Sequence, residues 1–352
     1  MPALPATDDQ ALPRLKDALH TLRKRELEQL SLGVPLNDLF RTRTGLVDGF
    51  ITATWEETGL QNAHASLIAV GGYGRGELFP HSDIDILVLL SEDAPTTVAS
   101  QVESFISQLW DAGLHLGHST RTPEECLTLA ACDLSIMTSL LEARLLTGSS
   151  RLWHAVIIPL FTPASDIWPP QAFFRGKQAE QQARHHRFDD SAYKIEPNIK
   201  ESPGGLRDWH TLRWLSCRIF HHDATPQLVT EGLMTDLEQT ALLERIEFLS
   251  RLRFTLHLLT DRHEDRLLLI HQKALAAMYS EAPVPGALAD EPDTRNQHVE
   301  AFMQRYFRAV LGLERINQLV MQQFEERLFP PEGEPFALNP RFNLRGKLIE
   351  TA

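Results

Sequence analysis

One stretch of the sequence decides the fold: residues 69–88 read AVGGYGRGELFPHSDIDILV. A short apolar run, residues 66–70, ends directly in a Gly-Gly pair. A second apolar run, residues 84–90, follows after a turn-rich segment and begins within an Asp-x-Asp sequence. Both runs have the length of a β-strand and are bounded by turn residues. The stretch therefore predicts a strand, a glycine turn and a second strand that starts with two carboxylates.

The two carboxylates, Asp83 and Asp85, point to the same side because side chains alternate along a strand. Adjacent carboxylates repel each other unless a cation lies between them, and Mg²⁺ prefers one or two carboxylates together with phosphate oxygens. Gly71 and Gly72 let backbone N–H groups approach a phosphate without a Cβ in the way. Arg75 offers a guanidinium to the same phosphates. These residues predict a cradle for a metal–triphosphate complex.

The alternative is a glycine loop followed by a solvated strand start. Gly-Gly alone, or Asp-x-Asp alone, favours that alternative, whereas the two together between apolar strands favour the metal–phosphate site. A Walker A loop is excluded because no Gly-Lys-Ser/Thr follows the glycines. A dinucleotide-binding fingerprint is excluded because a strand rather than a helix comes next.

This pattern resembles the nucleotidyltransferase superfamily of the DNA polymerase β type. Residues 71–89 are more closely similar to one family within it, the bifunctional uridylyltransferase/uridylyl-removing enzymes that modify the nitrogen-regulatory PII protein. A second block, residues 194–208 (KIEPNIKESPGGLRD), resembles the helical segment that follows the transferase domain in that family. Shorter similarities extend the resemblance over about residues 60–330.

The resemblance implies that UMP is transferred from UTP to a tyrosine hydroxyl of PII, with release of pyrophosphate. Asp83 and Asp85 would then be the catalytic residues and would hold Mg²⁺. Gly71 and Gly72 would contact the β- and γ-phosphates, and Ser82 is expected beside the nucleotide as well.

Two features depart from the family pattern. The later strand, residues 115–121, lacks the third carboxylate that the superfamily usually carries. Glu142 is a candidate third metal ligand, although a surface or helix-capping role suits it better, and His118 is a candidate base. The family's phosphohydrolase domain and its ligand-sensing domains would lie beyond residue 352, so we expect uridylyl removal and glutamine sensing to be absent from this chain.

Three basic residues of the second block, Lys194, Lys200 and Arg207, surround a Gly-Gly turn that opens a helix. Such a turn is a plausible anion site, and it could close over the base or the triphosphate. A structural loop with ordinary ion pairs is the alternative. Farther along, His257 and His263 have a poor spacing for zinc on a helix, so we expect a buried helix histidine near a charged helix end.

The periodicity predicts an α+β protein, in which a polymerase-β-like nucleotidyltransferase domain with a small mixed sheet precedes an all-helical domain. We expect two helices over residues 1–58, the nucleotidyltransferase domain over residues 59–162 and the helical domain over residues 163–330. Residues 331–352 show no clear period and are expected to be a tail or a linker. Within the second part, residues 133–146 have helical spacing.

Composition narrows the range of partners. The chain has 34 basic and 47 acidic residues, a net charge of −13, which argues against a nucleic-acid binder. No apolar run approaches the roughly 18 residues of a membrane span. The three cysteines form no CxxC pair, which excludes a disulfide framework and a thiolate zinc site and favours the cytoplasm. The expected partners are UTP and PII, without nucleic acid or membrane.

Two other functions stay open on the residues alone. No residue ties the site to uracil rather than adenine, so transfer of AMP to a protein or a small acceptor is one of them. The missing third carboxylate leaves room for a regulatory module that binds a nucleotide without turnover.

Overall fold

A computed structural model describes residues 11–60, 64–162, 166–221, 224–279, 292–330, 336–345 and 348–351. Its helices, in chain order, are α1 (Ala11–Ser31), α2 (Leu36–Glu57), α3 (Gly71–Gly74), α4 (Thr96–Asp111), α5 (Pro123–Cys132), α6 (Leu134–Leu141), α7 (Ser150–Phe161), α8 (Pro170–His186), α9 (Leu206–Phe220), α10 (Ala224–Thr230), α11 (Asp236–Thr260), α12 (Leu269–Tyr279) and α13 (Pro292–Leu328). Within these ranges, no helix combines the length and the apolar character that crossing a membrane requires.

The main sheet has four strands in the order β3-β2-β1-β4. The strands are β1 (Ala65–Ala69), β2 (Ile84–Leu90), β3 (Leu116–Arg121) and β4 (Arg144–Gly148). β1 is antiparallel to both of its neighbours, whereas β2 and β3 are parallel. The parallel pair is possible because α4 carries the chain back along the sheet between the two strands. The small mixed sheet predicted from the sequence is confirmed.

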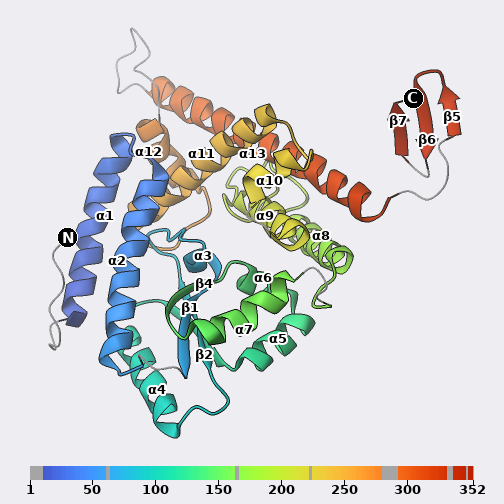
Figure 1. Ribbon diagram of the computed structural model, residues 1–352. Coiled ribbons are helices and arrows are strands. Elements are labelled where there is room, and N and C mark those ends of the chain that lie inside the picture. The colour runs from blue at the N-terminus through green and yellow to red at the C-terminus, as the bar shows by residue number, and fades with distance from the viewer. Residues whose placement is uncertain are drawn as a thin grey trace.

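The side chains of β2 alternate between two apolar cores. Ile86 and Val88 belong to the core that includes α2 and α4, whereas Leu87 and Leu89 belong to the core that includes α5, α6 and α7. Figure 1 shows α2 on one side of the sheet and α5, α6 and α7 on the other. The sheet is therefore covered on both faces, and its functional residues can lie only at the strand ends.

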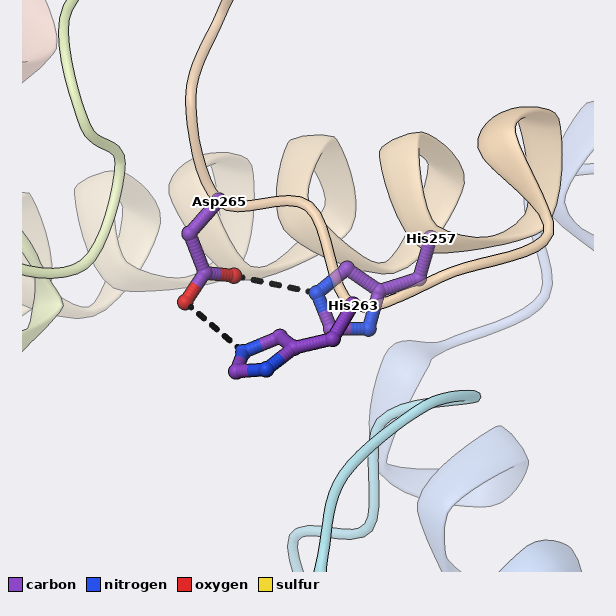
Figure 2. Close-up of side chains that lie close together, drawn as sticks. All are labelled: His257, His263 and Asp265. Atoms are coloured by element: carbon purple, nitrogen blue, oxygen red, sulfur yellow. Dashed lines mark hydrogen bonds and ion pairs between the residues drawn. The ribbon is translucent and has the colours of Figure 1, made fainter.

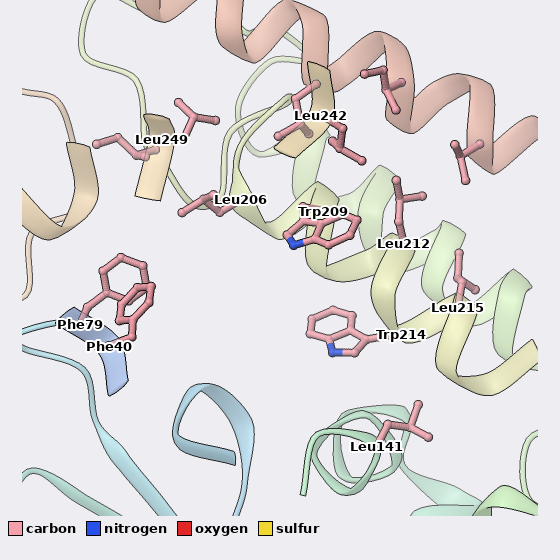
Figure 3. Close-up of a cluster of buried hydrophobic side chains, with 14 of the residues drawn as sticks. Phe40, Phe79, Leu141, Leu206, Trp209, Leu212, Trp214, Leu215, Leu242 and Leu249 are labelled. Atoms are coloured by element: carbon pink, nitrogen blue, oxygen red, sulfur yellow. The ribbon is translucent and has the colours of Figure 1, made fainter. Parts of the chain in front are cut away.

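The second core continues from the sheet into the mostly helical region. Phe40 of α2, Phe79 before β2 and Leu141 of α6 share one buried cluster with Leu212 of α9 and Leu249 of α11, as Figure 3 shows. The cluster crosses the predicted division between the nucleotidyltransferase domain and the helical domain. Because both parts pack on the same core, a site between them is held by close packing.

Residues 144–148 correct the expectation of a helix over residues 133–146. Helix α6 ends at Leu141, and the following residues form β4 on the edge of β1. Gly148 has φ +98°, and a Cβ on it would lie 2.5 Å from the carbonyl oxygen of Ala65, so the close approach of β4 to β1 needs a glycine there. A leucine-rich run suits a helix or a strand, and the free edge of β1 decides for the strand.

The C-terminal residues also form structure that the sequence analysis did not predict. β5 (Phe336–Asn339), β6 (Phe342–Arg345) and β7 (Leu348–Thr351) make a separate antiparallel sheet. Figure 1 shows this sheet beyond the end of α13, away from the other elements. The division of the chain into four parts stays a prediction.

Candidate functional site

The predicted glycine turn forms the short helix α3 directly after β1. Gly71 has φ +58°, a conformation that L residues rarely adopt, and a Cβ on it would lie 3.3 Å from Oδ2 of Asp85. The backbone N–H of Val70 donates to the carbonyl oxygen of Asp85 at 3.0 Å. The glycine turn and the second aspartate therefore lie against each other, as the cradle hypothesis expects.

The carboxylate pair lies at the start of β2. Burial, followed by the charge of Asp83, raises the pKa of Asp85 above its ordinary value, and the charge of Lys200 partly offsets this. A carboxylate whose ionisation is opposed by a second carboxylate gains from a divalent cation between the two. Oxygen donors of this kind are the ligands that Mg²⁺ prefers, so the residues present fit the predicted metal.

Strand β3 explains why no third carboxylate joins the pair. Gly117 lies opposite Asp85 in the parallel ladder, and a Cβ on Gly117 would lie 2.2 Å from Oδ1 of Asp85. Any side chain at this position would displace the aspartate. The next residue, His118, is exposed and makes an edge-on contact with Trp110 at 5.3 Å between ring centroids. His118 is not among the residues that line the cavity beside the carboxylate pair.

Arg75 is held between two carboxylates. Its Nε lies 2.8 Å from Oε2 of Glu77, its Nη1 lies 2.7 Å from Oε1 of Glu142, and its side chain is 10% exposed. The indole N–H of Trp214 also donates to Glu142. Burial alone would raise the pKa of Glu77, but the charge of Arg75 and its other partners hold that pKa well below its ordinary value. Glu77 is therefore charged, and Glu142 binds Arg75 and Trp214 in this structure.

A cavity of about 570 Å³ joins the carboxylate pair to a basic wall in the helical region. Lys200, Arg207 and Arg253 lie on that wall. The residues singled out from the sequence that line this cavity are Gly71, Gly72, Arg75, Ser82, Asp83, Asp85, Glu142, Lys200 and Arg207. Lys194 is not among the lining residues, and its ammonium pairs with Asp189 instead.

Lys200 is positioned by hydrogen bonds of its own loop. Oδ1 of Asn198 accepts from the backbone N–H of Lys200 at 3.0 Å and from that of Glu201 at 2.7 Å. The carbonyl oxygen of Lys200 accepts from the N–H of Arg207 at 2.8 Å, in the first turn of α9. Burial, followed by the charges of Arg253 and Arg207, lowers the pKa of Lys200 to about 8. A mostly buried lysine with two cationic neighbours gains from an anionic ligand.

Sequence analysis did not point to the wall of the cavity that contains Lys177. Lys177 of α8 is 3% exposed, and its Nζ lies 3.1 Å from Oγ1 of Thr138 and 2.5 Å from Oε2 of Glu180. The same ammonium lies 4.3 Å from the ring centroid of Trp214, a cation–π contact. These residues come from α6, α8 and α9, which are far apart in the chain, so no local motif marks them.

His257 and His263 meet at Asp265, as Figure 2 shows. Nε2 of His257 lies 3.0 Å from one carboxylate oxygen, and Nε2 of His263 lies 3.2 Å from the other. The donor set could hold a metal ion, but Arg253 also donates to Asp265, from Nε at 2.6 Å. A guanidinium at that distance disfavours a second cation. The expected buried helix histidine is confirmed, because His257 is fully buried and burial lowers its pKa to about 4.

The cluster of His257, His263 and Asp265 contacts the loop that forms part of the basic wall. The carbonyl oxygen of Asp265 accepts from the N–H of Ile199 at 2.8 Å, which is the residue before Lys200. The side chains of Arg253 and His263 line the cavity as well. The contacts of Asp265 therefore fix the loop that carries Lys200.

Comparisons with known proteins find two family matches and a set of similar enzymes. Residues 172–321 match the family described as GlnD PII-uridylyltransferase, and residues 54–145 match the nucleotidyltransferase domain family. The chain is 43% identical over 320 residues to a bifunctional uridylyltransferase/uridylyl-removing enzyme of Methylococcus capsulatus, which covers 90% of this chain and 35% of the relative. For enzymes of the same description, identity is 37% over 338 residues in Pseudomonas fluorescens (95% of this chain, 36% of the relative) and 38% over 348 residues in Azotobacter vinelandii (98% and 38%).

The chain spans only about a third of the length of the curated relatives that it matches. The first of the two family matches falls on the helical region with the basic wall, and the second falls on most of the sheet with the carboxylate pair. The chain is therefore a nucleotidyltransferase region of the GlnD PII-uridylyltransferase family.

Proposed function

We propose that the chain transfers UMP from UTP to a tyrosine hydroxyl of a PII signalling protein and releases pyrophosphate. The observation that carries this proposal is the single cavity in which the Asp83–Asp85 pair faces Lys200, Arg207 and Arg253. Its volume of about 570 Å³ lies within the range of small-molecule sites. The choice of uracil and of PII is supported by the family match and the relatives' names.

Each part of the cavity has a role in this reaction. Asp83 and Asp85 would hold Mg²⁺, which when bound neutralises charge on the triphosphate and on the leaving pyrophosphate. Gly71 and Gly72 leave room for the phosphates close to the backbone. Lys200 and Arg207 would bind phosphate oxygens from the opposite side.

The chemical step is a displacement at the α-phosphorus of UTP. The phenolic oxygen of the acceptor forms the new P–O bond, the bond to the oxygen that bridges the α- and β-phosphates breaks, and pyrophosphate leaves with that electron pair. The phenol loses its proton to solvent, which is easier for a tyrosine than for an aliphatic alcohol because its pKa is about 10. The chain's contribution is to position the two reactants and to stabilise the charge that develops.

The shifted pKa of Lys200 predicts a pH dependence of UTP binding. Because that pKa is about 8, Lys200 carries its charge below this pH and loses it above. The affinity for UTP with Mg²⁺ should be constant up to about pH 8 and then weaken, by at most about tenfold per pH unit, because binding must return a proton to the amine. Titration calorimetry from about pH 7 to about pH 9.5 measures this.

Two variants test whether Lys200 causes the pH dependence of UTP binding. Lys200→Met should bind UTP about tenfold more weakly at neutral pH and lose the slope above pH 8. Lys273→Met, on the exposed side of α12, should behave as the wild type. A slope that persists in Lys200→Met would assign the titration to another group.

The proposed reaction is tested by the intact mass of PII after incubation with the chain, Mg²⁺ and either UTP or ATP, together with pyrophosphate release. We expect a mass gain of one UMP per modified tyrosine with UTP and none with ATP. A gain with ATP would retain the nucleotidyltransferase and reject uridylyl transfer. Nucleotide binding without any mass gain would favour the regulatory module.

A further inference from the structure

We propose that a second cavity beside Asp83 receives the acceptor tyrosine. This inference rests on the proposed function. The cavity has a volume of about 440 Å³ and lies between α1, the turn that precedes β2 and the turn that follows α11. No sequence motif pointed to it, and it gives the N-terminal helix α1 a part in the site.

The two cavities meet at the carboxylate pair. Ser82, Asp83 and His263 line both of them. Asp83 therefore stands between the basic wall on one side and the second cavity on the other. A group bound in the second cavity can reach the carboxylate pair without crossing the basic wall.

The transfer requires the nucleotide and the acceptor to reach the carboxylate pair from different sides. In an in-line displacement the attacking and leaving oxygens lie on opposite sides of the phosphorus. Lys200 and Arg207 attract the pyrophosphate end of the nucleotide within the first cavity. The attacking phenol must then arrive from the side away from these groups, which is the side that the second cavity opens.

The floor of the second cavity suits an aromatic ring. Leu78, Phe79 and Ile84 line it and are 2%, 5% and 5% exposed. His115 and Arg262, which also line it, are exposed and form part of its rim. An apolar floor below an open rim can bury the ring of a tyrosine while the chain that bears the ring stays outside.

The arginines that line this cavity are already paired with carboxylates. Arg23 pairs with Asp261 at 2.6 Å, and Arg43 pairs with the buried Glu26. Arg262, on the rim, is likewise 2.8 Å from a carboxylate oxygen of Glu264. Since the cations that line the cavity are paired, it suits a neutral phenol better than a second triphosphate.

Two buried polar atoms lie in the wall of this cavity. Nε of Arg23 and Nε2 of His81 are buried and make no hydrogen bond among the described residues. Nε2 of His81 lies 3.3 Å from Oδ1 of Asp261. The apolar floor and the open rim together favour the acceptor tyrosine of the partner protein as the occupant.

The test fills the cavity from α1. Leu19 lines it and is partly exposed, so Leu19→Trp places an indole in the space for the tyrosine ring. We expect the KM for PII to rise about tenfold or more, while the KM for UTP and the melting temperature stay close to the wild type. Leu27→Trp is the matched control, because Leu27 lies on the same helix, is 36% exposed and does not line the cavity.

A second variant, at a residue outside α1, tests the same cavity in case Leu19→Trp disturbs the folding of α1. His115→Trp adds an indole at the exposed rim and should raise the KM for PII in the same way. The inference is overturned if the wild-type chain modifies PII and both variants keep the KM of Leu27→Trp, a result that leaves the proposed function intact. If the wild-type chain modifies no tyrosine of PII, the inference and the proposed function fail together.

Discussion

Replacing Asp85 by asparagine should lower kcat for UMP transfer by a factor of about 10² to 10³. The amide keeps the shape of the side chain but removes the charge that a divalent cation needs. The same change should leave the melting temperature equal or slightly higher. Burial and Asp83 raise the pKa of Asp85, so its ionised form opposes folding at neutral pH, and the neutral amide removes that penalty.

The control for this variant is Asp111→Asn, at the exposed end of α4. It should keep the wild-type rate, which shows that loss of an acidic charge elsewhere has no effect. Steady-state rates of pyrophosphate release and thermal melts of both variants decide the matter. A rate for Asp85→Asn within a few-fold of the wild type would remove Asp85 from the metal site.

Replacing Arg75 by methionine should destabilise the fold by about 3–5 kcal/mol, because it removes the guanidinium that pairs with the buried Glu142 and with Glu77. Glu142 is 8% exposed. Of the two partners described above, Arg75 and Trp214, it would keep the N–H of Trp214. Glu77 would keep Arg213, at 2.8 Å. These groups come from different parts of the chain, and the Arg75 guanidinium links the glycine turn to the residues that follow α6.

Denaturant unfolding measures this loss. Arg41→Met is the matched control, since Arg41 is 80% exposed and pairs with Asp38 in the adjacent turn of α2. An exposed pair of this kind contributes at most about 1 kcal/mol. Equal stability of the two variants would show that the carboxylates around Arg75 find other partners.

The carboxylate pair and the glycine turn were predictable because all of their parts lie within residues 69–88 and local rules fix them. Strand alternation orients Asp83 and Asp85, the N–H of Val70 donates to the carbonyl oxygen of Asp85, and Gly71 lies against the Asp85 side chain. Three of the four strands of the mixed sheet were predictable on similarly local grounds, since β1, β2 and β3 are short apolar or turn-bounded runs.

The rest of the site depends on contacts between distant segments. The sequence analysis favours a surface or helix-capping role for Glu142, but its pairing with Arg75 follows from β4, whose strand conformation depends on the free edge of β1. Arg253 reaches the cavity only because α11 packs on the shared core. Lys194 and Lys200 are equally basic in the sequence, and the fold brings only Lys200 to the cavity.

The most direct test of the metal site is an electron paramagnetic resonance titration of Mn²⁺, a substitute for Mg²⁺, with a non-hydrolysable UTP analogue. The wild-type chain and Asp85→Asn would be compared under the same conditions. If Asp83 and Asp85 hold the cation, the wild-type chain with nucleotide binds Mn²⁺ and Asp85→Asn binds it at least about tenfold more weakly. Equal Mn²⁺ affinity of the two proteins would contradict a divalent-cation site at this carboxylate pair.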